Sequence, residues 1–395
     1  MDINERSLEL GSKRSVIREL FEYGKKRKAE IGADKVYDFS LGNPSVKPPK
    51  MVEETLKSLL LSVDPSALHG YTSAQGDLAT RTAVANTLNK LCDFEISPDF
   101  IYMTCGAAAS LTVSLKAVLN RGDECIVFAP FFTEYRVFIE NADGKVVIST
   151  PDESNFQIDF ADLSAKITVK TKAVIINSPN NPSGVVYTYD TIKKLSDILR
   201  KKSDEIGHTI FLISDEPYRE LVYNGQKIPF IMNYYDNSLV CYSYSKSLSL
   251  PGERIGYIAV SPRCADAEKV YNAVCGAGRS LGFVCAPSLF QKLIAECADL
   301  TVDISAYKEN REILYENLKS MGYKCVKPDG AFYLLVGCFG LEASEFSEKA
   351  KKHELLVVPC DDFGIKGYVR IAYCVSKETI VNSLPAFKAL SKEFL

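Results

Sequence analysis

Short runs rich in β-branched and aromatic residues alternate with segments of helical periodicity through the middle of this chain. This alternation is typical of βαβ units, in which helices join parallel strands and cover the sheet that they form. The sequence therefore predicts an α/β fold with a mainly parallel sheet. We expect strands at residues 100–104, 124–129, 145–149, 173–177, 209–214, 238–243 and 256–260.

The two ends of the chain differ in character from its middle. We expect an N-terminal helix at residues 14–30, and a long amphipathic helix begins near residue 286 with SLFQKLIAECADL. The strand-like runs GAFYLLV and YVRIAYC follow, and they indicate a separate α+β lobe. With 395 residues, the chain is long enough for two domains.

Composition and charge exclude several classes of function. The net charge of -3 leaves no basic excess to neutralise phosphates, so we expect no general binding of nucleic acid. No apolar run approaches the roughly 20 residues that span a bilayer, so we expect no membrane segment. The first residues, MDINERSLELGSKRSVIREL, are too charged for a signal peptide, which predicts a cytoplasmic protein.

The cysteines and histidines do not form the pattern of a metal site. The 12 cysteines include no C-x-x-C pair, and the 3 histidines are scattered without ligand spacing. We therefore expect reduced cysteines that serve as small buried side chains, and no bound metal.

The residues that follow the expected strands are candidates for a ligand site, because open α/β sheets bind ligands beyond the carboxyl ends of their strands. They are CGAAAS after the first strand, then PFFTEY, PNNPSG, DEPY and finally Lys246. Singly, each has an ordinary structural explanation, such as a tight turn, a loop, a helix cap or a surface lysine. Together they match one ligand with a phosphate, a flat ring, a ring nitrogen, a phenolic oxygen and an aldehyde. Pyridoxal 5'-phosphate has all five groups.

The ordered set of motifs resembles the class I and II pyridoxal-phosphate-dependent aminotransferases of fold type I, which include aspartate aminotransferase. The motifs run nearly from end to end: DFSLGNP, GYTSAQGDLATR, PNNPSG, DEPY, SYSKSLSLPGERIGY and YVRIAY. The resemblance implies a large cofactor-binding domain, residues 48–285, on a mostly parallel seven-stranded sheet. It also implies a smaller α+β domain that combines residues 1–47 with residues 286–395.

The resemblance assigns the chemistry to a few side chains. Lys246 would form a Schiff base with the cofactor and then serve as general base at the substrate Cα, which requires surroundings that favour its neutral form. Asp215 would keep the cofactor ring nitrogen protonated. Tyr218 would hydrogen-bond the phenolic oxygen from one side, and Asn181 from the other, where Asn181 also faces the substrate.

The same resemblance implies how the rest of the cofactor is held. Backbone N–H groups at a helix N-terminus, two hydroxyls and a guanidinium would bind the phosphate. These donors come from Gly106, Ala107, Ala108, Ser243, Ser245 and Arg254. Phe132 would stack on the ring, with Phe131 as the alternative one residue earlier.

Further residues would bind the substrate and the partner subunit. Arg370 would bind the substrate α-carboxylate through its planar fork, beside the backbone N–H of Gly42. Tyr71 would reach the phosphate in the neighbouring subunit, so the resemblance implies a homodimer with shared active sites.

The expected function is an aminotransferase that moves an amino group between an L-amino acid, with aspartate favoured, and a 2-oxo acid such as 2-oxoglutarate, through a pyridoxamine intermediate. A dicarboxylate needs a second cation, for which Arg279, Arg136 and Lys116 are candidates. Alanine or an aromatic amino acid is an alternative donor. A C–S β-lyase acting on cystathionine or cysteine, and a non-catalytic cofactor-binding module, also stay open.

Overall fold

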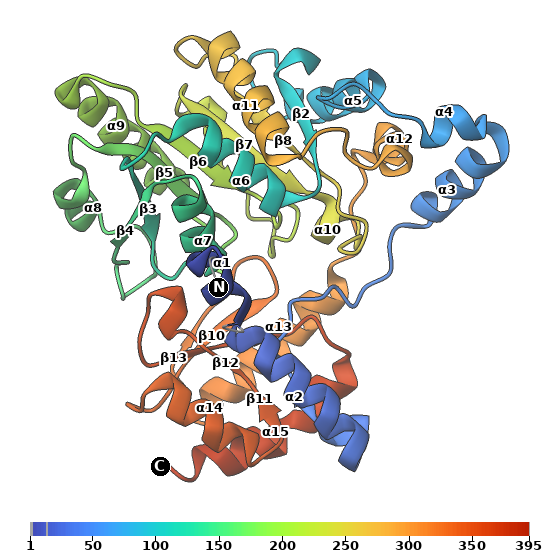
Figure 1. Cartoon of the computed structure of the whole chain (residues 1–395). Helices are drawn as coiled ribbons and strands as arrows, with labels where there is room; N and C mark the ends of the chain where they lie inside the picture. Colours follow the sequence, from blue (N-terminus) through green and yellow to red (C-terminus); the bar gives the residue numbers. More distant parts are fainter. Residues whose placement is uncertain (1–2, 13–14, 395) are drawn as a thin grey trace.

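The computed structural model describes residues 3–12 and 15–394, which fold into a larger and a smaller lobe (Figure 1). Within these residues the larger lobe contains one seven-stranded sheet. Its strands are β2 (Ile101–Thr104), β3 (Glu124–Phe128), β4 (Lys145–Ser149), β5 (Thr171–Asn177), β6 (Phe211–Asp215), β7 (Ser238–Ser243) and β8 (Gly256–Val260). They lie in the order β2-β8-β7-β6-β5-β3-β4, and only β8 runs antiparallel to its neighbours.

The predicted mostly parallel seven-stranded sheet is confirmed. The strands expected at 145–149, 238–243 and 256–260 agree at both ends with β4, β7 and β8. The others differ by at most two residues at either end. One of these differences concerns Asp215, which is the last residue of β6 and pairs with Cys241 of β7. The backbone of Asp215 is thus fixed by the sheet itself.

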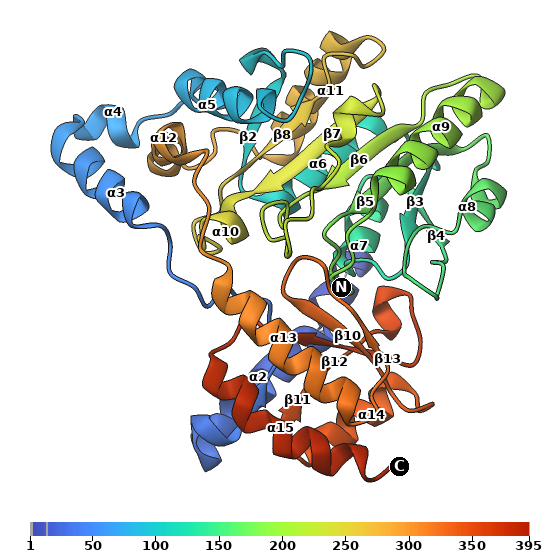
Figure 2. The same ribbon diagram turned by 180° about the vertical axis from the view of Figure 1, so that it is seen from behind.

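Helices cover both faces of this sheet (Figures 1 and 2). They are α3 (Lys50–Ser62), α4 (Pro65–His69), α5 (Leu78–Asn89), α6 (Ala107–Val118), α7 (Glu134–Asn141), α8 (Phe160–Lys166), α9 (Tyr189–Ile206), α10 (Tyr244–Ser247), α11 (Ala267–Leu281) and α12 (Ser288–Cys297). The cores place α6, α7 and α11 on one face and α5, α8, α9 and α12 on the other. In α9, for example, Ile192, Leu195 and Leu199 recur at helical spacing and are buried against the sheet.

The smaller lobe combines a segment from near the N-terminus with the C-terminal part of the chain around a second core. Its strands are β1 (Tyr37–Asp38), β9 (Cys325–Val326), β10 (Tyr333–Gly337), β11 (Leu355–Leu356), β12 (Val358–Pro359) and β13 (Tyr368–Ala372). The antiparallel order is β12-β13-β10-β9, while β1 pairs in parallel with β11. Its helices are α2 (Val16–Ile31), α13 (Ser305–Ser320), α14 (Ala343–Lys351) and α15 (Lys377–Ser391).

Shorter elements complete the fold. Turns of 3₁₀ helix occur at Ala33–Lys35, Pro98–Phe100, Ile231–Asn233 and Asp361–Phe363. The additional helix α1 (Glu5–Ser12) lies against the larger lobe, where Arg6 forms an ion pair with Glu140 of α7 at 3.0 Å. Of the N-terminal helix expected at 14–30, Arg14 lies outside the described residues, and α2 accounts for the remainder.

The long helix expected from near residue 286 is wrong, because the chain forms two helices there, α12 and α13. Between them the backbone N–H of Val302 donates to the carbonyl of Ser247 at 2.8 Å, a contact that a continuous helix would not leave available. The predicted domain limits stay a prediction. Although α12 lies beyond residue 286, it packs in the larger lobe, where Thr80 of α5 donates to the Gln291 carbonyl at 2.8 Å.

Candidate active site

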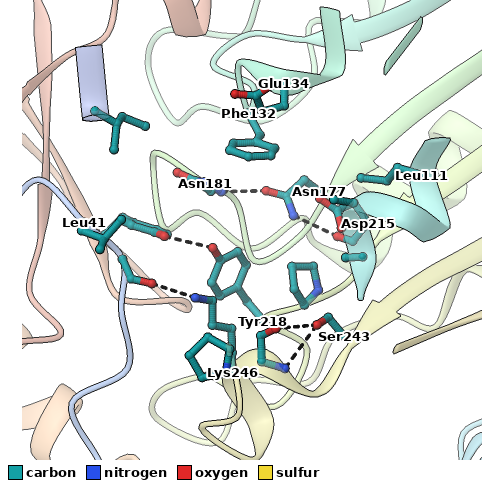
Figure 3. A pocket seen from close by; sticks show the side chains of 18 of the residues that line it. Leu41, Leu111, Phe132, Glu134, Asn177, Asn181, Asp215, Tyr218, Ser243 and Lys246 are labelled. Atoms are coloured by element: carbon teal, nitrogen blue, oxygen red, sulfur yellow. Dashed lines mark hydrogen bonds between the residues drawn. The ribbon is translucent and has the colours of Figure 1, made fainter. Parts of the chain in front are cut away.

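A cavity of about 530 Å³ lies between the carboxyl ends of the large sheet and the smaller lobe (Figure 3). Most of the site residues predicted from the strand ends and from the family resemblance line it. They are Gly42, Ala107, Ala108, Phe132, Asn181, Asp215, Tyr218, Ser243, Ser245, Lys246, Arg254 and Arg370. The first and last of these residues, Gly42 and Arg370, lie more than 300 positions apart in the sequence. The fold therefore brings distant segments of the chain to one cavity.

Lys246 reaches the cavity from α10, the short helix that follows β7. Its Nζ donates to the carbonyl of Gly42 at 2.7 Å and lies 5.4 Å from the ring centre of Phe332. Burial lowers the pKa of Lys246 from 10.5 to about 8, and the cations Arg254 and Arg370 act in the same direction. Compared with a free lysine, the surroundings therefore shift the equilibrium toward the neutral amine.

Asp215 is buried at the end of β6 with an incomplete set of hydrogen bonds. Tyr135 donates its hydroxyl to Oδ2 at 2.5 Å, whereas Oδ1 is buried without a partner among the described residues. Burial raises the pKa of Asp215 from 3.8 to about 7, although the bond from Tyr135 opposes this. An unpaired buried acceptor of this kind fits a cationic N–H donor, such as a protonated ring nitrogen.

A group of donors converges at the N-terminus of α6. Gly106 precedes this helix with φ +87°, and a Cβ built there would lie 3.0 Å from Nη2 of Arg254. The hydroxyls of Ser243 and Ser245 lie 2.7 Å apart at the same end of the cavity. Helix N–H groups, hydroxyls and a guanidinium that meet at one place fit a phosphate.

Arg370 projects from β13 and is 2% exposed. Its Nη1 donates to Oδ1 of Asn181 at 3.1 Å and its Nη2 to the carbonyl of Ser40 at 2.6 Å, while Nε is buried without a partner. No carboxylate forms an ion pair with Arg370 within the described part of the chain, so the alternative of a core ion pair does not hold there. A buried cation with neutral acceptors only is suited to an anionic ligand.

The remaining predicted residues have distinct locations. Phe132 lines the cavity, whereas Phe131 is 1% exposed and lies in the core beneath it. Tyr71, in contrast, lies outside the cavity on the segment after α4, and 99% of its side chain is exposed. None of the three candidate second cations lines the cavity. Lys116 forms an ion pair with Asp143, Arg136 lies 5.2 Å from the ring centre of Phe131, and Arg279 lies in α11.

Sequence reasoning missed several residues that the structure brings to this site, and four of them bear on its chemistry. Tyr135 holds Asp215, and a signal was present, because it lies one helical turn after Phe132 in the motif PFFTEY. Asn177, the last residue of β5, donates to the Asp215 carbonyl at 2.9 Å. Tyr333 and Arg18 also line the cavity. Both come from the smaller lobe, where no strand end of the large sheet could indicate them.

The arrangement is that of a pyridoxal-phosphate enzyme, and comparison with known proteins identifies the class. The chain belongs to the family described as aminotransferase class I and II, whose sequence model matches residues 34–386. It is therefore an aminotransferase that depends on pyridoxal 5'-phosphate.

Individual relatives match this chain over nearly its whole length. The chain is 31% identical over 389 residues to a probable aspartate aminotransferase of Methanocaldococcus jannaschii, with 96% of this chain and 97% of the relative covered. It is 28% identical over 392 residues to aromatic-amino-acid aminotransferase 2 of Thermococcus litoralis, with 96% of each covered. A crystal structure of an amino transferase from Eubacterium rectale is 56% identical, with a TM-score of 0.98, and the match covers 100% of this chain and 99% of that one.

Two further features bear on partners. Over residues 3–12 and 15–394, no helix combines the length and the apolar character that a membrane crossing needs. The same residues include no cluster of histidine, cysteine, aspartate and glutamate side chains that could hold a metal ion.

Proposed function

We propose that this aminotransferase moves the amino group of L-aspartate to 2-oxoglutarate. Arg370, a buried guanidinium without an acid partner in the described structure, supports an α-amino acid as substrate, because it lies in the same cavity as Lys246. The observation that supports aspartate in particular is the position of Arg18 in this cavity. A substrate α-carboxylate would neutralise Arg370 and offer an acceptor to its unpaired Nε. Binding in this way would direct the substrate Cα toward Lys246.

We assign the roles in the proposed reaction to individual residues of this chain. The bound cofactor supplies a cationic ring that takes up electrons when the Cα–H bond breaks. Lys246 accepts the Cα proton in its neutral form, which its lowered pKa favours. Asp215, whose Oδ1 is unpaired, would accept a hydrogen bond from the ring nitrogen, and Tyr218 and Asn181 would hold the phenolic oxygen. Phe132 would stack on the ring, and the phosphate would be held by Gly106, Ala107, Ala108, Ser243, Ser245 and Arg254.

Arg18 supports aspartate as the donor. It lies in the first turn of α2 and lines the cavity. Its guanidinium has no hydrogen-bond or ion-pair partner within residues 3–12 and 15–394, so its charge is available to a ligand. We assign to Arg18 the distal carboxylate of the substrate, a role for which the sequence suggested Arg279, Arg136 or Lys116.

An aromatic donor is the second candidate. Ile17, Phe21 and Leu41 also line the cavity, and these side chains form an apolar wall that an aromatic ring could contact. The similarity to an aromatic-amino-acid aminotransferase agrees with this alternative.

Steady-state kinetics of the holoenzyme with L-aspartate, L-tyrosine and L-alanine tests the proposal. Arg18→Ala should lower kcat/KM for aspartate by about 5- to 30-fold, because a charge-assisted contact is worth roughly 1–2 kcal/mol at a partly open site. The values for tyrosine and alanine should stay unchanged. Arg279→Ala, on α11 outside the cavity, is the matched control and should change none of the three.

The kinetics also distinguishes the alternatives. If the wild type preferred tyrosine or alanine to aspartate, the proposal of aspartate as the donor would be wrong, and the preferred amino acid would take its place. Release of pyruvate and ammonia from cystathionine, without any 2-oxo acid added, would establish the C–S β-lyase instead. An equal loss for all donors in Arg18→Ala would contradict the role of Arg18 while leaving transamination in place.

We also propose a homodimer in which Tyr71 completes the neighbouring active site. The fully exposed Tyr71 is accompanied by exposed apolar side chains of α3 and α5, namely Leu60, Leu61 and Leu78. Exposed apolar side chains of this kind favour association with a second copy of the chain. A cytoplasmic location stays a prediction.

A further inference from the structure

Tyr333, a buried tyrosine of β10, joins two parts of the candidate active site. Its hydroxyl oxygen lies 3.0 Å from the hydroxyl oxygen of Tyr218, and its ring centre lies 4.7 Å from the guanidinium carbon of Arg370. Tyr218, which Figure 3 labels, lies beside Lys246 in the cavity. A continuous chain of contacts therefore runs from Arg370 in the smaller lobe to Tyr218 in the larger lobe.

Gly42 makes this position of Tyr333 possible. A Cβ at Gly42 would lie 2.0 Å from the Tyr333 hydroxyl oxygen and 2.8 Å from Cζ, far inside van der Waals contact. The carbonyl of the same glycine accepts the hydrogen bond from Lys246. Gly42 thus leaves room for the Tyr333 hydroxyl and also accepts the hydrogen bond from Lys246.

We propose that Tyr333 is a positioning residue for transamination, whose hydroxyl donates to the Tyr218 hydroxyl and directs the Tyr218 proton to the cofactor's phenolic oxygen. The proposal rests on the role proposed above for Tyr218. A phenol has one proton, so when Tyr218 donates to the cofactor it can only accept from Tyr333. A hydroxyl that accepts a hydrogen bond becomes a stronger donor, by roughly 10–30% per bond.

The charges around the pair favour this direction of donation. Burial raises the pKa of both phenols, and Arg370 acts against burial at both. The guanidinium carbon of Arg370 lies 4.7 Å from the ring centre of Tyr333, and a cation beside a phenol makes its hydroxyl a better donor. The charged and titratable groups around the pair are Asp215, Arg370, Cys374 and, across Gly42, Lys246.

The test is a pH titration of the visible absorption of the cofactor bound to the holoenzyme, which reports on the site without measuring turnover. A donor to the phenolic oxygen stabilises its ionised form, so removing the donor raises the pH midpoint of the absorption change. Tyr218→Phe should raise the midpoint by about 1–2 units. Tyr333→Phe retains the ring beside Arg370 and should raise it by roughly 0.2–0.6 unit.

The two hydroxyls act in series, so the double variant should shift the midpoint no further than Tyr218→Phe alone. Gly42→Ala forces the Tyr333 hydroxyl from its place and provides a second test, with an upward shift again expected. The control is Tyr323→Phe, which removes a buried hydroxyl of the smaller lobe that donates to the Phe387 carbonyl at 2.8 Å. Its midpoint should equal that of the wild type.

The outcomes separate this inference from the proposal on which it rests. If Tyr218→Phe raises the midpoint and Tyr333→Phe does not, or if the double variant shows the sum of the two shifts, the role of Tyr333 is overturned alone. If Tyr218→Phe leaves the midpoint unchanged, the proposed role of Tyr218 is overturned and the role of Tyr333 with it.

Discussion

At the scale of single residues, Asp215 destabilises the protein that lacks its cofactor. Its carboxyl group is 4% exposed, and only one of its two oxygens accepts a hydrogen bond. Ionising it in this position is costly, which is why its pKa rises to about 7. A carboxyl group placed to bind a cationic ligand thus lowers the stability of the fold until the ligand is bound. Residues that serve function often lower stability in this way.

Asp215→Asn should therefore stabilise the cofactor-free protein at neutral pH. The pKa of Asp215 is about 7 in the folded protein, above its ordinary value of 3.8. The contribution of the protonated carboxyl to the free energy of unfolding is therefore fully present below about pH 4 and is lost as the pH rises to about 7. The variant should gain roughly 2–4 kcal/mol over the wild type above pH 7 and nothing near pH 4. Urea unfolding across this pH range measures the difference. A pH-independent difference, or one shared by Asp204→Asn on the exposed side of α9, would contradict the explanation.

At the scale of elements, the start of α6 depends on a backbone conformation that favours glycine. Gly106 has φ +87°, in the left-handed region, and the space beside it is filled by the guanidinium of Arg254. Arg254 itself has φ +52° and donates to the Pro251 carbonyl at 3.0 Å, so it has little freedom to move away. The helix terminus and the guanidinium are consequently fixed against each other.

Gly106→Ala should weaken cofactor binding by about tenfold or more, because the displaced guanidinium loses a charge-assisted hydrogen bond worth roughly 1.5–3 kcal/mol. Gly207→Ala is the matched control, since Gly207 has φ +76° after α9 but no atom within 4 Å of a Cβ. Both variants should lose about 1 kcal/mol of stability through backbone strain, but only Gly106→Ala should change the cofactor Kd. Equilibrium dialysis and thermal unfolding measure the two effects. If the cofactor Kd were equal in Gly106→Ala and Gly207→Ala, the proposed link between Gly106 and cofactor binding would be refuted.

Much of this architecture could be predicted from local patterns, and the exceptions depend on contacts between distant segments. Strands such as β4 were predictable because they are short apolar runs bounded by turn residues. The break between α12 and α13 was not, since the segment between these helices contacts a distant part of the chain through the hydrogen bond from Val302 to Ser247. Tyr333 likewise received no role, because its partner Tyr218 lies 115 positions earlier in the chain.

At the scale of the whole molecule, the cavity is divided between the two lobes. Arg370 and Gly42 belong to the smaller lobe, whereas Lys246 and Asp215 belong to the larger one. We propose that substrate binding closes the lobes, because a carboxylate on Arg370 must approach Lys246 while water is excluded from the reacting carbon. Tyr71 does not line the cavity of its own chain, so the role proposed for Tyr71 requires a second subunit.

The shared-site arrangement can be tested by mixing two defective subunits. Tyr71→Ala and Lys246→Ala subunits, coexpressed in equal amounts, should form hybrid dimers in which one of the two active sites has no substitution. Random association makes half of the dimers hybrids, so activity should recover to about a quarter of the wild-type value. The control mixes Lys246→Ala with Asp215→Asn, two substitutions that lie in one cavity of one chain and should not complement each other. If Tyr71 acted within its own subunit, the first mixture would show no more activity than its separate components.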